Sequence, residues 1–190
     1  MKSSTAKLLA GALLVMPFAA LAHTGPGAHG FADGFIHPFL GMDHLLAMLV
    51  VGIWSVLHAR KVWLAPLCFV SFLAVGAVLG QNGVSEVQLE PLVAASVLVL
   101  GLMLTLPFSL GESAALAVIG AFAVFHGMAH GSELSNGGNV LVGIVLGSAL
   151  LHATGMSFAH SVLKQRPLLT QRLGQLVAVL GGGLLLSSVL

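Results

Sequence analysis

Six long apolar runs constrain the fold of this chain more than any other feature of its sequence. Each is close to the roughly 20 residues that a helix needs to cross about 30 Å of hydrocarbon. Because backbone polar groups inside a bilayer must be hydrogen-bonded within the chain, each run is predicted to be helical. Only 7% of the 190 residues are charged and 57% are hydrophobic, which excludes an ordinary soluble domain. The runs are residues 34–57, 62–80, 91–106, 113–130, 140–160 and 168–189.

A shorter segment precedes these runs and has the features of a signal peptide. Two lysines come first, an apolar stretch covers residues 8–19, and residues 20–22 read Ala-Leu-Ala, the pattern of a cleavage site. We therefore expect residues 1–22 to be a cleaved signal peptide; the alternative is an uncleaved first helix. Residues 23–33 would then form a polar, histidine-containing periplasmic lead. Residues 34–190 are predicted to form an all-α membrane protein, a compact six-helix transmembrane bundle.

The positions of Lys and Arg predict the orientation of this bundle. The loops 81–90 and 131–139 contain neither residue. Cytoplasmic loops carry an excess of Lys and Arg, so an exported N-terminus would place both termini outside. With five basic and six acidic residues after the signal peptide, the chain has no polybasic surface for nucleic acid. The five basic residues follow the first run or flank the turn before the sixth: Arg60, Lys61, Lys164, Arg166 and Arg172.

Three of the runs carry a concentration of histidines. Ionisable residues are costly inside a membrane and by default mark a functional site. A single buried histidine is usually a hydrogen-bonded packing residue, but six in three runs favour a polar pathway. A methionine in such a run is more often a packing residue than a ligand. The candidate metal ligands in and beside these runs are His37, Asp43, His44, His126, His130, Glu133, His152 and Met156.

Helical geometry arranges these candidates in a ladder. If residues 34–57 form one helix, His37 and His44 lie about 20° from alignment, and Asp43 points roughly 100° away. His44 and His152 fall near the middle of their runs, whereas His130 lies further out. Such a series suits an ion that moves between weak sites.

The donor types narrow the choice of metal without fixing it. Imidazole and carboxylate suit Ni²⁺, Co²⁺, Zn²⁺, Cu²⁺ or iron, and Cys68 is the only cysteine, which argues against a thiolate-rich site. Neutral imidazole is the ligand form, so binding is expected to weaken as the pH falls through about 6.5. After signal cleavage, His23 with its free α-amine and His29 could capture a divalent ion outside; the alternative is a disordered terminus.

Two long motifs resemble those of a known family. They are His37-Pro38-x-x-Gly41-x-Asp43-His44-x-x-Ala47-Met48-x-x-Val51-Gly52 and His126-Gly127-x-Ala129-His130-Gly131-x-Glu133. Both are similar to motifs of the HupE/UreJ family of bacterial nickel permeases. The resemblance implies a non-enzymatic secondary transporter, with no prosthetic group, that moves Ni²⁺ across the inner membrane, with Co²⁺ as the second candidate ion. It also implies handover to maturation proteins of hydrogenase or urease. The assignment of His152 and Met156 as candidate ligands rests on helical spacing and not on the resemblance.

Other readings of the histidines stay open at this stage. The histidines could be the axial ligands of a membrane haem protein, or the ligands of a metal-binding sensor or accessory protein. They could also belong to an intramembrane metalloenzyme, although no HExxH sequence is present. No P-loop sequence occurs, so the chain encodes no recognisable ATPase. Glycine pairs four residues apart let helices approach closely, within one chain or in a homo-oligomer: Gly76 and Gly80, Gly127 and Gly131, Gly143 and Gly147.

Overall fold

The computed structural model describes residues 30–84, 89–106, 111–131 and 138–190, which form helices and turns with no strand among them. All six apolar runs are helical. In each of the last five runs, the helix begins and ends within two residues of the predicted first and last residues. The predicted signal peptide lies outside the described residues. The helices are α3 (Phe31–Leu40), α4 (Met42–His58), α5 (Leu64–Gln81), α6 (Leu89–Thr105), α7 (Glu112–Gly131), α8 (Gly138–Phe158), the π-helix η1 (Ala159–Leu163) and α9 (Pro167–Val189).

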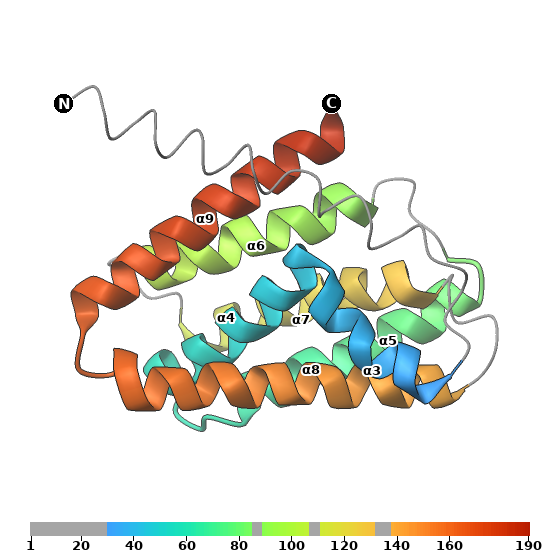
Figure 1. The fold of residues 1–190 in the computed structure, drawn as a ribbon, viewed down its shortest axis with the longest axis horizontal. Helices are drawn as coiled ribbons and strands as arrows, with labels where there is room; N and C mark the ends of the chain where they lie inside the picture. The colour runs from blue at the N-terminus through green and yellow to red at the C-terminus, as the bar shows by residue number, and fades with distance from the viewer. Residues whose placement is uncertain (1–29, 85–88, 107–110, 132–137) are drawn as a thin grey trace.

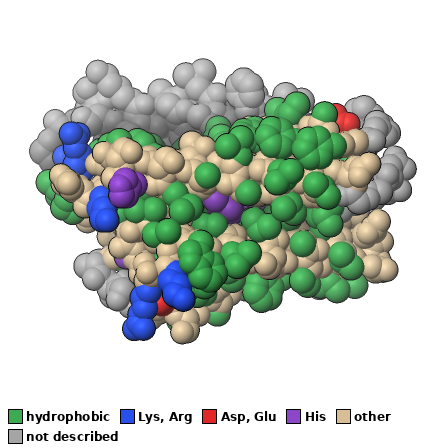
Figure 2. Space-filling model, turned by 90° about the horizontal axis from the view of Figure 1, so that it is seen from below, with side chains coloured by type: hydrophobic (Ala, Val, Ile, Leu, Met, Phe, Trp, Pro, Cys, Tyr) green, Lys and Arg blue, Asp and Glu red, His purple; other side chains and the backbone are tan. Residues whose placement is uncertain are grey.

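Within the described residues, length and composition make four or five segments candidate membrane spans. α5, α7, α9 and the continuous segment Asn139–Leu163 are each long and apolar enough, and the bent pair α3 and α4 is the fifth candidate. α6 has 17 residues and is a shorter apolar helix. Figure 2 shows hydrophobic side chains over much of one face, with Lys and Arg at one end of it. The protein is therefore an all-helical, multi-pass membrane protein.

The first apolar run is not one helix, and the prediction of a continuous helix over residues 34–57 is wrong. α3 and α4 meet at an angle of 84°. Gly41 lies between them with an extended backbone (φ −85°, ψ 125°), and its carbonyl accepts the Leu45 N–H at 2.9 Å, so α4 starts afresh there. Pro38, in the last turn of α3, has no N–H to donate to the helix. Across this break the rings of His37 and His44 lie 6.0 Å apart, between centroids.

Glycines set the closest helix contacts. A Cβ on Gly127 of α7 would clash with the Leu73 carbonyl of α5, and one on Gly143 of α8 would clash with the Phe31 carbonyl of α3. Their backbones therefore pack directly together, as small residues in membrane helices allow. The predicted glycine pairs thus serve packing within one chain.

α4 is the most enclosed helix, with α8 packed along one side and α6, itself covered by α9, on another (Figure 1). Its buried side chains include Met48, Val51 and Trp54. The start of α4 faces the end of α7, because the His44 ring lies beside the rings of His126 and His130. The fold therefore places the N-terminus of α4, just after the break at Gly41, in the interior of the helix bundle.

Candidate metal centre

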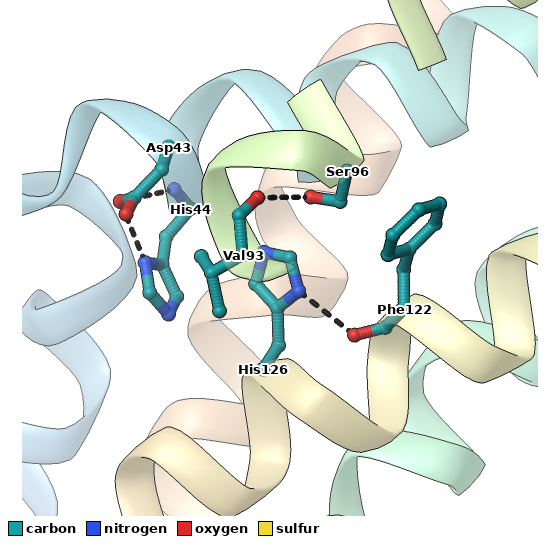
Figure 3. Close-up of polar contacts among 6 residues, drawn as sticks. All are labelled: Asp43, His44, Val93, Ser96, Phe122 and His126. Carbon is teal, nitrogen blue, oxygen red and sulfur yellow. Dashed lines mark hydrogen bonds and ion pairs between the residues drawn. The ribbon is translucent and has the colours of Figure 1, made fainter. Parts of the chain in front are cut away.

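The first turn of α4 holds a carboxylate against an imidazole. Asp43 Oδ1 lies 2.8 Å from Nδ1 of His44 and also accepts the His44 backbone N–H at 2.8 Å (Figure 3). A carboxylate in the first turn is favoured by the helix dipole. Gly41 provides the space, since a Cβ there would lie 2.8 Å from Asp43 Oδ1 and 3.2 Å from His44 Nδ1. The break and the hydrogen-bonded Asp43–His44 pair are thus parts of one local structure.

Four imidazoles from three helices meet around this pair, and we call them the outer histidine cluster: His37, His44, His126 and His130. The His44 ring lies 4.5 Å from that of His130 and 4.8 Å from that of His126, between centroids. The His37 ring lies 4.5 Å from that of His130 and 6.0 Å from that of His44. His44, His126 and His130 are at most 1% exposed. The rings form a compact group and not a widely spaced ladder.

Hydrogen bonds determine which ring nitrogen carries the proton. Nδ1 of His126 lies 3.0 Å from the Phe122 carbonyl (Figure 3), and Nδ1 of His152 lies 2.8 Å from the Met48 carbonyl. Oxygen atoms of carbonyls and ionised carboxylates can only accept. In the neutral rings of both histidines, and of His44 beside Asp43, Nδ1 therefore donates and Nε2 carries the lone pair. This is the arrangement in which an imidazole binds a metal through Nε2.

His152 stands apart from the outer histidine cluster. Its ring centroid lies 5.2 Å from that of Phe69, and the Phe69 centroid lies 5.4 Å from that of His126. Phe69 is fully buried, and His152 is 1% exposed. Within the described parts of the chain, the Nε2 atoms of His126 and His152 are buried and have no hydrogen-bond partner. Two unpartnered imidazole nitrogens thus flank one aromatic ring.

The donor atoms do not form a ready-made metal cage. Among the described residues, no group of three or more His, Cys, Asp or Glu is arranged to hold one metal ion. The His37 and His130 rings meet edge to face, with an interplanar angle of 86°. In this conformation the cluster offers neighbouring donors and not a closed coordination shell.

The other predicted ligands have different positions. His23, His29 and Glu133 lie outside the described residues. Met156 is half-buried on α8, one turn after His152, and so shares its helix face. The structure brings together His37, Asp43, His44, His126 and His130, which the sequence had placed in a spaced series, and it does so through the helix break at Gly41.

Sequence reasoning missed Phe69 and the role of Gly41. Phe69 sits in an apolar run where an aromatic residue carries no signal of its own. Gly41 did have a signal, because Pro38, Gly41 and Asp43 together are typical of a helix end followed by a new start. The apolar character of residues 34–57 outweighed that signal.

Comparison with known proteins gives two matches and one negative result. The sequence profile described as "HupE / UreJ protein" matches residues 11–184. The chain is 38% identical over 176 residues to "Protein HupE" of Rhizobium leguminosarum bv. viciae, an alignment that covers 90% of this chain and 88% of that protein. No solved structure gives a significant match.

Proposed function

Because the chain belongs to the HupE/UreJ family, we propose that it is a permease for divalent transition-metal ions, Ni²⁺ first and Co²⁺ second, in the bacterial inner membrane. The family is associated with nickel and cobalt transport. One observation carries the proposal for this chain: buried imidazoles from separate helices, each with Nδ1 held by an oxygen acceptor. That arrangement leaves Nε2 of His44, His126 and His152 as the lone-pair nitrogen.

The energetics favour a ligand role over a packing role. A buried polar atom without a hydrogen bond costs about 1–3 kcal/mol, and among the described residues Nε2 of His126 and Nε2 of His152 are two such atoms. An apolar side chain of similar volume would avoid that cost. A metal ion bound through Nε2 would offset it, and imidazole nitrogen is a suitable donor for Ni²⁺.

We assign the donors to steps along a path. His37, His130 and Glu133 receive the ion from outside, after capture by the terminal His23 and His29. His44 and His126 bind it deeper, while Asp43 fixes the orientation of the His44 ring, as carboxylates behind metal-bound histidines do. Since no three donors converge among the described residues, the ion would keep part of its water shell, which suits binding that is weak enough for release.

The charge distribution supports a direction for this path. The five basic residues that follow the predicted signal peptide lie in the connections α4–α5 and α8–α9 and at the start of α9. The Arg60 N–H donates to Glu112 Oε1 at 2.9 Å, so the start of α7 lies at the same end as the α4–α5 connection. We propose that this end is cytoplasmic, that all six apolar segments cross the membrane, and that the outer histidine cluster opens to the periplasm.

The cluster geometry does not favour a haem. Two axial imidazoles must leave a gap for the porphyrin between them, and centroid distances of 4.5 to 4.8 Å within the cluster leave none. A metal sensor or an accessory protein would use the same ligands as a permease. Flux across a membrane separates these functions, since only a permease moves the ion.

The test is uptake of radioactive nickel by proteoliposomes of purified protein, with Co²⁺, Zn²⁺ and Cu²⁺ as competitors. The parent should accumulate nickel, and His44→Ala should not. His58→Ala is the matched control, because His58 is an exposed histidine at the other end of the same helix. Binding without uptake in the parent would contradict a permease, and equal uptake by His44→Ala would contradict this site.

A further inference from the structure

His152 joins two helices and yet keeps a free nitrogen. Its Nδ1–H donates to the Met48 carbonyl at 2.8 Å, which links α8 to α4. Gly52, one turn after Met48, lies so close to the His152 backbone that a Cβ there would clash with the His152 carbonyl. The imidazole is therefore held firmly, while its buried Nε2 has no partner in the described structure.

Phe69 contacts both the His152 ring and the His126 ring of the outer histidine cluster. The Phe69 centroid lies 5.4 Å from that of His126 and 5.2 Å from that of His152, at interplanar angles of 65° and 74°. From His37 through His130, His44 and His126, each ring is within 5 Å of the next. A phenyl ring has no lone pair, so the series of metal donors is interrupted at Phe69 and resumes at His152.

We propose that His152 Nε2 is a separate inner binding site, which takes a divalent transition-metal ion from His126 past Phe69. This proposal rests on the proposed function and adds a second station to it. Met156 lies one helical turn further toward the cytoplasmic end and shares the His152 face. The ion thus moves in two steps, capture in the outer histidine cluster and transfer to His152.

A structural role alone would need only Nδ1. Asparagine can place its side-chain N–H near the position of histidine Nδ1 and so donate to the Met48 carbonyl, but it has no counterpart of Nε2. His152→Asn therefore removes the metal donor while it keeps the link between α8 and α4. The matched control is Ser148→Ala, one turn earlier on α8, where a fully buried hydroxyl donates only to the Ile144 carbonyl of its own helix.

The experiment measures initial nickel uptake by proteoliposomes over a range of Ni²⁺ concentrations, together with the melting temperature of each purified variant. His152→Asn should lower the maximal rate about tenfold or more and change KM less than about twofold, because the outer histidine cluster still captures the ion. Ser148→Ala should behave as the parent does. Parent-like uptake by His152→Asn, or a raised KM at an unchanged maximal rate, would overturn the inner site.

A second measurement does not depend on any variant. In the folded parent with ¹⁵N-labelled histidine, titration with diamagnetic Zn²⁺ should shift the His152 Nε2 resonance; no shift at saturating Zn²⁺ would also overturn the inner site. The two proposals fail differently. A parent that moves no nickel contradicts the permease, whereas a parent that transports normally with a parent-like His152→Asn contradicts only the inner site.

Discussion

Asp43→Asn tests how the carboxylate acts on the metal path. Asparagine keeps an oxygen that can accept both hydrogen bonds from His44, so the geometry survives while the negative charge is lost. Replacing a carboxylate behind a ligating histidine typically lowers metal affinity about 10- to 100-fold, which corresponds to about 1.4 to 2.7 kcal/mol. The loss of charge at the helix N-terminus should cost folding only about 0.3–1 kcal/mol. Asp43→Asn should therefore lower the metal affinity more than it lowers the free energy of unfolding.

The assay is the Ni²⁺ concentration dependence of uptake, with thermal unfolding measured in parallel. KM should rise about 10-fold or more, in line with the affinity loss, and the melting temperature should change little. Asp33→Asn is the control, because Asp33 is an exposed aspartate in the first turn of α3. An unchanged KM would refute the idea that Asp43 tunes His44. A large loss of stability would assign Asp43 to folding instead.

Three further predictions concern the backbone and the topology. Gly41→Ala should raise KM for nickel about 10-fold or more, because its Cβ would lie 2.8 Å from Asp43 Oδ1 and displace it; uptake at the parent KM would contradict the packing argument. Gly52→Ala should destabilise the protein by about 1–3 kcal/mol through its clash with α8. In the same unfolding assay Gly182→Ala, with nothing within 4 Å of its Cβ, should be neutral or slightly stabilising; equal effects would contradict the close approach. An alkaline phosphatase fused after Leu190 should be active, and an inactive fusion would place the C-terminus in the cytoplasm.

The sequence predicted the positions of the helices because the bilayer leaves the backbone few choices. An apolar run must satisfy its own hydrogen bonds, so the bounds of α5 to α9 follow from hydropathy within two residues. Hydropathy does not indicate whether the chain changes direction inside such a run. For that reason the break at Gly41 was missed, although Pro38 and Gly41 are both visible in the sequence.

The members of the outer histidine cluster were predictable, but their mutual positions were not. Histidines in apolar runs are rare, so residue type alone identifies them as candidate metal ligands. Their contacts depend on which helices pack together, and spacing along one helix does not contain that information. The link between His152 and the Met48 carbonyl, 104 residues apart, is an example, and so is the position of Phe69 between two imidazoles.

The most direct test of the account is the nickel K-edge X-ray absorption spectrum of the nickel-loaded, purified protein. We predict nitrogen and oxygen neighbours with the multiple scattering of imidazole. That imidazole signal should weaken in His44→Ala and in His126→Ala and stay unchanged in His58→Ala. A spectrum without imidazole scattering, or one that neither cluster variant alters, would contradict the claim that the outer histidine cluster binds the transported ion.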